Sequence, residues 1–88
     1  MSKVRNILFI MADQLRWDYL SCYGHSHLKT PNIDSIAKKG ILFESAYVQS
    51  PVCGPSRASY YTGRTVFSHG STWNQVPLPI GELTIGDY

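Results

Sequence analysis

The stretch Ser50–Gly63, SPVCGPSRASYYTG, organises the rest of this 88-residue chain. It predicts a loop that carries Cys53 between two prolines, then a short helix over residues Ser56–Thr62 that ends at Gly63. A thiol just before a helix N-terminus lies in the positive end of the helix dipole, which favours the thiolate and attracts anions. Arg57 follows about one helical turn later, so its guanidinium can clamp an oxyanion with two hydrogen bonds. These residues predict a reactive group beside an anion pocket.

The first half of the chain has the pattern of a strand, a helix and a second strand. Val4–Ala12 is a nearly continuous apolar run, which is typical of a strand buried on both faces of a parallel sheet. Thr30–Gly40 is the clearest helix, with Thr30 suited to the N-cap and Pro31 to the first helical position. Ile41–Tyr47 then predicts a second strand. The pattern indicates an α/β fold with a βαβ start and a right-handed crossover.

Asp13 directly follows the first predicted strand. Ligands of open α/β sheets bind beyond the carboxyl ends of their strands. Asp13 is therefore a candidate metal ligand or catalytic carboxylate, while a turn or N-cap aspartate is the structural alternative.

A second group of metal-ligating residue types consists of Cys22, His25, His27 and His69. Their spacing matches no strong zinc pattern, so surface or core side chains are favoured over a zinc site. His69 and Asn74 both lie in Arg64–Pro79, which has no strong periodicity and predicts an excursion of the chain over the site. Either could face the pocket, although loop His and Asn are more often turn formers.

Composition excludes several classes of protein. The net charge is +2 and the basic residues are scattered, so no nucleic-acid-binding stripe is present. No apolar run approaches the ~20 residues of a membrane span, and the first run is too short for a signal peptide. We expect a cytoplasmic protein without nucleic-acid or membrane partners. Cys22 and Cys53 could pair, but nothing else suggests a secreted disulfide scaffold.

The last residues, Leu83–Tyr88, contain a possible helix start. Thr84 and Asp87 have the spacing of a capping box, and the chain ends within the first turn that this box would open. We therefore expect residues 1–88 to be the N-terminal fragment of a single larger catalytic domain, with an incomplete site.

The motif Cys53–Arg57 (CGPSR), followed by Thr62–Arg64 (TGR), resembles the signature of the type I sulfatases in the alkaline phosphatase superfamily. Other segments resemble that family in the same order: Asn6–Ile10 leading to Asp13, Thr30–Asp34, and Phe43 through Ala46-Tyr47. The resemblance covers essentially the whole chain. It implies the N-terminal part of an alkaline-phosphatase-like sulfatase fold with a largely parallel sheet.

The resemblance also implies a chemistry. In this family the motif cysteine, here Cys53, is converted by a formylglycine-generating enzyme to formylglycine, an aldehyde. One oxygen of the hydrated aldehyde attacks the ester sulfur or phosphorus, and the second hydroxyl is deprotonated as the adduct collapses and releases the oxyanion. Asp13 and the modified Cys53 match metal ligands, and Arg57 matches the arginine that holds the formylglycine hydroxyl. The metal is divalent, with Ca²⁺ first and Mn²⁺ or Mg²⁺ as alternatives.

One departure bears on the branch of the family. Many sulfatases have two successive aspartates after the first strand, whereas this chain has Asp13-Gln14. Together with an asparagine after the signature, this resembles the branch of phosphonate monoester hydrolases and choline sulfatases. On that match Asn74 would bind a non-bridging oxygen of a small sulfate or phosphonate ester, and His69 stays structural.

Two alternatives remain open at this stage. Cys53 with Arg57 could be a thiolate oxyanion site, as in cysteine phosphatases, although such sites usually have more residues between the two. The 88 residues could also be an inactive, marginally stable piece, because parallel strands depend on their neighbours. A homo-oligomer is compatible with the sequence but not indicated by it.

Overall fold

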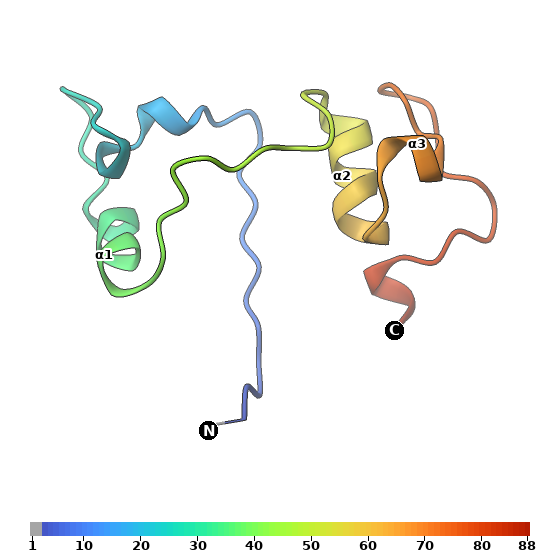
Figure 1. Ribbon diagram of the computed structural model, residues 1–88, viewed down its shortest axis with the longest axis horizontal. Helices are drawn as coiled ribbons and strands as arrows, with labels where there is room; N and C mark the ends of the chain where they lie inside the picture. The colour runs from blue at the N-terminus through green and yellow to red at the C-terminus, as the bar shows by residue number, and fades with distance from the viewer. Residues whose placement is uncertain (1–2) are drawn as a thin grey trace. The chain divides into compact units, whose positions relative to one another are not determined.

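The computed structural model describes residues 3–88. They divide into two units, one extending to Leu42 and the other comprising Phe43–Tyr88. The first unit contains the 3₁₀ turns η1 (Trp17–Tyr19) and η2 (Ser21–Tyr23) and the helix α1 (Pro31–Lys39). The second contains α2 (Cys53–Thr62), α3 (Val66–His69) and the 3₁₀ turn η3 (Ile85–Asp87) (Figure 1).

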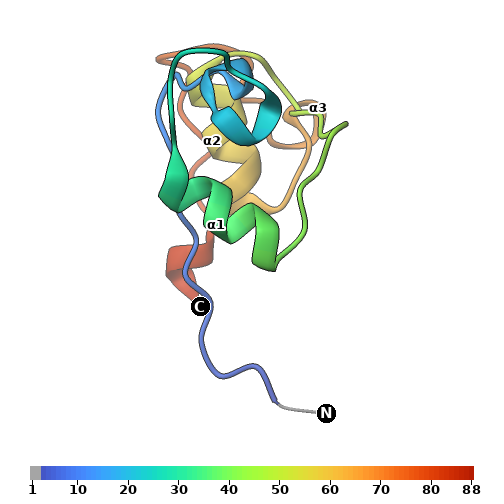
Figure 2. The same cartoon turned by 90° about the vertical axis from the view of Figure 1, so that its left-hand side faces the viewer.

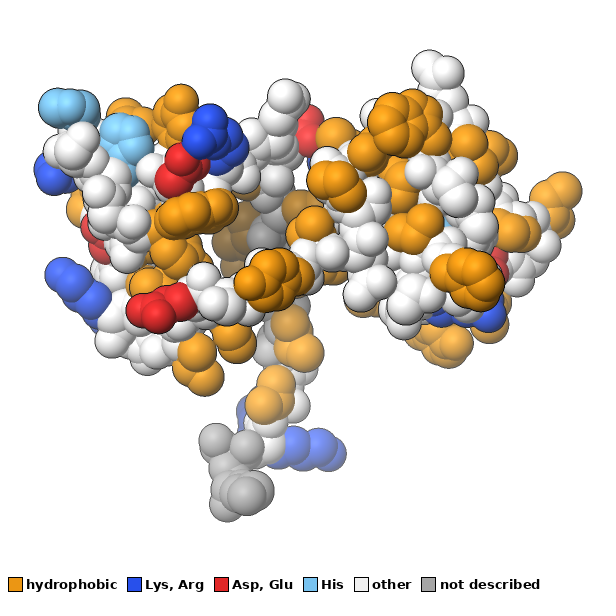
Figure 3. Space-filling view, turned by 45° about the horizontal axis from the view of Figure 1, so that its top comes forward, with side chains coloured by type: hydrophobic (Ala, Val, Ile, Leu, Met, Phe, Trp, Pro, Cys, Tyr) orange, Lys and Arg blue, Asp and Glu red, His pale blue; other side chains and the backbone are white. Residues whose placement is uncertain are grey.

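The two predicted strands are not formed as strands within residues 3–88. Val4–Ala12 is an extended segment without helical turns (Figure 2), and Ile41–Tyr47 has no strand partner either. Hydrophobic side chains lie open along the N-terminal segment (Figure 3), where Ile7 is 87% exposed and Ile10 76%. A strand exists only as part of a ladder of backbone hydrogen bonds with a neighbouring strand, and no such ladder is formed within residues 3–88. The apolar pattern therefore predicts that these side chains are buried, but within residues 3–88 they are exposed.

The helix α1 confirms the predicted helix, with one correction at its start. Pro31 takes the first helical position, where its missing N–H costs nothing. The helix ends at Gly40, whose N–H donates to the Ile36 carbonyl oxygen at 2.9 Å. Thr30 is the N-cap residue, but its hydroxyl does not cap the backbone. It donates instead to the Asp34 carboxylate at 3.0 Å, because that stronger acceptor lies one turn along the helix.

A cluster of Ser21, Thr30 and Asp34 fastens η2 to α1. The Ser21 hydroxyl donates to Asp34 Oδ2 at 2.6 Å, and the Ser21 N–H donates to Thr30 Oγ1 at 3.0 Å. The Thr30 N–H donates back to Ser21 Oγ at 2.8 Å. The Ser21 hydroxyl, with Thr30 and Cys22 in support, stabilises the ionised form and lowers the pKa of Asp34 below its ordinary value.

The helix α2 begins three residues earlier than Ser56, the predicted start. Cys53 occupies the first helical position, and the Ser56 N–H already donates to the Val52 carbonyl oxygen at 3.0 Å. Pro55 is compatible with this start because N–H groups of the first turn need no partner inside the helix. The predicted end is confirmed, since Gly63 adopts the left-handed conformation with φ of 68°.

The core of the second unit is small and partly polar. α2 packs against α3 and η3. The buried apolar residues of the described chain are Pro55 and Ala58, and Ser59, His69 and Ser71 are buried as well. Hydrogen bonds therefore carry much of the packing that apolar contacts supply in larger domains.

The predicted capping box is confirmed. The Thr84 N–H donates to Asp87 Oδ2 at 2.7 Å, and the Gly86 N–H donates to Thr84 Oγ1 at 3.3 Å. The box opens the short turn η3. Within residues 3–88, no helix combines the length and the apolar character needed to cross a membrane.

The lowered pKa of Asp34 predicts how the stability of the first unit depends on pH. A carboxyl group with a depressed pKa in the folded state stabilises the fold above its ordinary pKa of 3.8 and loses this contribution as the pH falls below it. Asp34→Asn should therefore lower the thermal midpoint of the full-length protein at neutral pH. The difference from the wild type should shrink when the pH is taken below 3.8.

The control is Asp18→Asn, which removes an exposed ion pair with Arg16 in the same unit and should have little effect. A midpoint for Asp34→Asn equal to that of the wild type at neutral pH would show that the cluster does not stabilise the unit.

Candidate functional site

Cys53 is the first residue of α2 and is exposed as a free thiol. The N–H groups of the first helical turn have no intrahelical acceptor and carry the positive end of the helix dipole. Arg57 lies on the same helix, one turn further along and partly buried. Residues four apart share one face of a helix, so Cys53 and Arg57 are neighbours as the sequence predicts. The correction is that the thiol belongs to the helix itself rather than to the loop before it.

Asn74 lies directly against this helix start. The Gly54 N–H, the second of the helix, donates to Asn74 Oδ1 at 2.8 Å across a separation of 20 residues. Asn74 therefore supplies the acceptor that the first turn lacks. With its oxygen occupied in this way, the Asn74 amide nitrogen is the group that can donate to a ligand beside Cys53.

This contact leaves little room for a side chain at position 54. A Cβ at Gly54 would lie 2.8 Å from Asn74 Oδ1 and 3.3 Å from Asn74 Cα. The second of these atoms is backbone and cannot rotate away. The motif CGPSR thus has a glycine at the position where the loop that carries Asn74 approaches the helix.

A tight turn presents Asn74 to the helix. The Val76 N–H donates to the Trp73 carbonyl oxygen at 3.2 Å, and Gln75 between them has a positive φ of 69°. The Ser71 hydroxyl donates to the Val76 carbonyl oxygen at 2.6 Å and closes the loop at its base. Sequence spacing alone gives no sign of this approach, because the loop has no periodic pattern.

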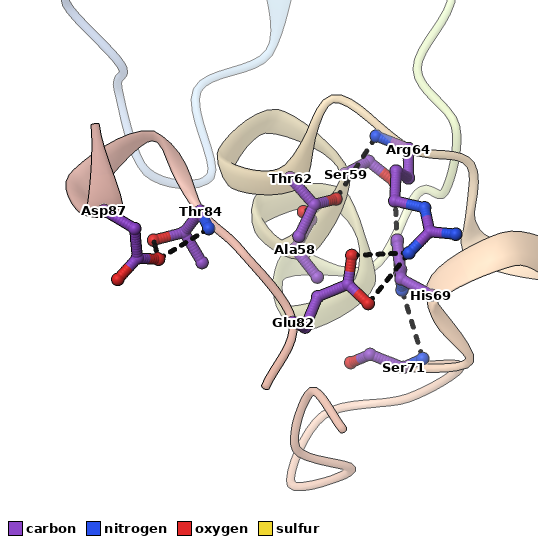
Figure 4. Close-up of polar contacts among 9 residues, drawn as sticks. All are labelled: Ala58, Ser59, Thr62, Arg64, His69, Ser71, Glu82, Thr84 and Asp87. Carbon is purple, nitrogen blue, oxygen red and sulfur yellow. Dashed lines mark hydrogen bonds and ion pairs between the residues drawn. The ribbon is translucent and has the colours of Figure 1, made fainter. Parts of the chain in front are cut away.

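His69, the last residue of α3, is buried at 1% exposure. Its Nε2 lies 2.9 Å from Ser59 Oγ on α2, and its Nδ1 accepts the Ser71 N–H at 3.1 Å (Figure 4). The structural role expected for His69 is confirmed, and both ring nitrogens are engaged within the protein.

The described residues give the zinc alternative no support. His25 Nδ1 accepts the N–H groups of His27 and Leu28 at 3.2 and 2.8 Å, so that nitrogen stabilises a turn. Within residues 3–88, no three side chains of His, Cys, Asp or Glu gather into a possible metal site. Cys22 and Cys53 are both free thiols.

Asp13 belongs to the first unit and Cys53 to the second. Asp13 is exposed at the end of the extended N-terminal segment, and Gln14 after it has a positive φ of 52°. A carboxylate is a suitable donor for Ca²⁺, Mg²⁺ or Mn²⁺, but an unmodified thiol is a soft ligand that suits these ions poorly. The described residues alone do not make a complete metal site.

The other end of α2 borders a separate pocket of about 570 Å³. Its walls come from residues 60–64 and 81–85 together with Tyr88, and neither Cys53 nor Asn74 lines it. Next to it, Arg64 Nη1 contacts both carboxylate oxygens of Glu82 at 2.7 and 2.9 Å (Figure 4). This ion pair joins the end of α2 to the C-terminal segment, and no sequence pattern pointed to it.

Comparison with known proteins decides the family. The sulfatase family model matches residues 5–88. This chain belongs to the sulfatase family. It is 48% identical to human arylsulfatase D over 65 residues, which are 74% of this chain and 11% of that protein. It is 42% identical to an uncharacterized sulfatase of Escherichia coli over 83 residues, or 94% of this chain and 17% of the relative.

An arylsulfatase of Clostridium perfringens is 48% identical over 65 residues, covering 74% of this chain and 14% of the relative. The resemblance inferred from the signature is thereby confirmed at the level of the family. The sulfatase family implies an α/β fold. The chain spans less than a fifth of the length of these relatives, as the covered shares of 11%, 17% and 14% state.

The contact between Gly54 and Asn74 predicts the sign of a stability change. In a helix free of steric conflict, Gly→Ala is stabilising by up to ~1 kcal/mol. Gly54→Ala should instead destabilise the full-length protein by about 1 kcal/mol or more. Its methyl group would displace Asn74 and break the bond from the residue 54 N–H, which is worth about 1 kcal/mol.

Thermal unfolding measures this effect, with Gly86→Ala as the control. The nearest atom to a Cβ at Gly86 is Thr84 Oγ1 at 3.6 Å, an ordinary contact. A raised midpoint for Gly54→Ala would mean that Asn74 does not rest on the helix start.

Proposed function

We propose that the protein containing this chain hydrolyses small sulfate esters, or phosphonate esters, with a formylglycine made from Cys53 as the nucleophile. The observation that carries the proposal is the position of Cys53. Cys53 is exposed at the first position of α2, and Asn74 accepts a hydrogen bond from the N–H of the next residue, Gly54. Membership of the sulfatase family, many of whose members have names such as arylsulfatase, supports the same conclusion.

The reaction that fits this position is a displacement at sulfur followed by an elimination. One hydroxyl oxygen of the hydrated aldehyde attacks the ester sulfur, and the ester alcohol leaves with its bonding electrons and a proton. The remaining hydroxyl then loses its proton, the bond between the aldehyde carbon and the sulfate oxygen breaks, and sulfate departs as the aldehyde reforms. Water hydrates the aldehyde again, so one water is consumed for each ester.

The residues near Cys53 would act as donors in this reaction. The Asn74 amide would donate to a non-bridging oxygen of the ester, where negative charge develops in the transition state. Arg57, on the same helix face as Cys53, would hold the diol through its guanidinium. The presence of Asn74 at the helix start favours the branch of phosphonate monoester hydrolases and choline sulfatases, because an asparagine after the signature resembles that branch.

A divalent metal completes the proposal. When bound, such an ion lowers the pKa of a coordinated hydroxyl and neutralises anionic oxygens. Asp13 offers a carboxylate of the type that Ca²⁺, Mn²⁺ or Mg²⁺ prefers. The modified Cys53 would be a second ligand, and the remaining ligands would come from outside residues 3–88, because the described residues contain no three-ligand cluster.

We also propose that Val4–Ala12 and Ile41–Tyr47 are strands of the α/β sheet in the full-length protein. Their exposed apolar side chains, with Ile7 at 87% and Ile41 at 79%, support this assignment, because a parallel sheet would cover both faces of each strand. A formylglycine-generating enzyme would be the modifying partner. A cytoplasmic location remains part of the proposal.

Thiol alkylation separates the aldehyde from a thiolate nucleophile. Hydrolysis of a chromogenic aryl sulfate by the full-length protein should fall to background in Cys53→Ala and after treatment with a chelator. It should survive iodoacetamide, because an aldehyde carries no thiol to alkylate.

The control is Cys22→Ala, which removes the other free cysteine of the described residues and should leave both activity and resistance to alkylation unchanged. Loss of activity on alkylation in the Cys22→Ala background would assign the reaction to a Cys53 thiolate and contradict the proposal.

A further inference from the structure

His69 is a buried polar group that the proposed chemistry does not use. It is 1% exposed, and both of its ring nitrogens have partners in the protein. A buried imidazole without hydrogen bonds lowers the stability of the fold by roughly 1–3 kcal/mol for each unsatisfied group. An apolar side chain would fill the same space without this cost. The hydrogen bonds of His69 therefore show which parts of the protein its side chain connects.

The partners of His69 fix its tautomer. The Ser71 N–H can only donate, so His69 Nδ1 is the unprotonated acceptor of that bond at 3.1 Å. The ring proton is consequently on Nε2, which donates to Ser59 Oγ at 2.9 Å. One nitrogen thus faces α2 and the other faces the loop that begins at Ser71 (Figure 4).

These bonds belong to a closed circuit that starts and ends on α2. Ser59 on α2 binds His69, and His69 binds the Ser71 N–H. The Ser71 hydroxyl holds the Val76 carbonyl oxygen at 2.6 Å, which closes the loop around Asn74. Asn74 then returns to α2 through the Gly54 N–H at 2.8 Å. His69 is the one member of the circuit that joins the helix to the base of the loop through its side chain.

We infer that His69 is a positioning residue, which acts on the reaction by holding the loop so that Asn74 stays at the start of α2 beside Cys53. This inference rests on the proposed function for its effect on catalysis. It goes beyond that function because it assigns a role to a residue that does not touch the substrate. A displacement of about 1 Å at a reacting group can cost on the order of 10²-fold in rate, so a remote anchor of this kind has a measurable effect.

Two substitutions separate the two faces of the imidazole. In His69→Gln the amide nitrogen replaces Nε2 as the donor to Ser59, and the acceptor for the Ser71 N–H is lost. In His69→Asn the amide oxygen replaces Nδ1 as the acceptor for Ser71, and the bond to Ser59 is lost. Only the first should release the loop, because α3 packs against α2 and keeps residue 69 in place when the bond to Ser59 is lost.

A double-mutant cycle on the full-length protein tests whether His69 acts through Asn74. Asn74→Ala should lower kcat/KM by ~10²-fold, the loss expected for one well-placed oxyanion donor. His69→Gln should lower kcat/KM by ~10-fold or more when Asn74 is present, and should have no further effect in the Asn74→Ala background. His69→Asn should recover most of the loss.

Equal losses from His69→Gln in both backgrounds would overturn the inference, because a general loss of folded protein is additive with Asn74→Ala. So would an unchanged kcat/KM in His69→Gln.

Amide hydrogen exchange at Gly54 gives a readout that is independent of activity. The Gly54 N–H should be protected from exchange in the wild type and in His69→Asn. It should exchange rapidly in Asn74→Ala and in His69→Gln. Continued protection in His69→Gln would overturn the positioning role even if the enzyme is a sulfatase. A wild-type protein that cleaves no sulfate or phosphonate ester would instead contradict the proposed function, and the exchange pattern would still decide the role of His69.

Discussion

The hydrogen bond from the Gly54 N–H to Asn74 Oδ1 is the contact on which the second unit depends. It satisfies a donor that the first turn of α2 leaves without a partner, and it ties together segments 20 residues apart. Gly54 allows this approach because it has no Cβ. The same bond holds the Asn74 side chain at the residue that follows Cys53, so one contact both caps the helix and brings two candidate site residues close in space. Stability and chemistry are therefore linked at a single position.

Polar anchors support this arrangement because the local core is small. Pro55 and Ala58 are the buried apolar residues among residues 3–88, whereas Ser59, His69 and Ser71 are buried and hydrogen-bonded. Directional bonds fix the loop of Asn74 more narrowly than apolar contacts of the same area would. The first unit uses the same device in the cluster around Asp34, where two hydroxyls donate to one carboxylate. In each unit, a polar cluster defines the geometry of the short helix that it holds.

Local signals predicted the local structure well. Pro31 and Gly40 bound α1, Gly63 ends α2, and Thr84 and Asp87 form the capping box, because each depends on residues within a few positions of one another. The predicted start of α2 is three residues too late, because Pro55 is compatible with the first helical turn and does not mark its boundary. The strands remain a proposal, since a strand depends on neighbours that lie far away in sequence. Cys53 and Asn74 are likewise far apart in the sequence. Spacing could place Arg57 beside Cys53, whereas Asn74 was only a polar loop residue that could face the pocket, and its substrate-binding role came from the family resemblance.

The central claim is that Cys53 becomes an aldehyde, and peptide mass measured after aldehyde-specific labelling tests it most directly. Trypsin should release the peptide from Gly40 to Arg57, in which Cys53 is the only cysteine. The full-length protein from its native host is treated with a hydrazide and with iodoacetamide before digestion. The account predicts that this peptide carries the hydrazone at residue 53 and no carbamidomethyl group. A peptide fully alkylated at the Cys53 thiol, with no hydrazone, would contradict it.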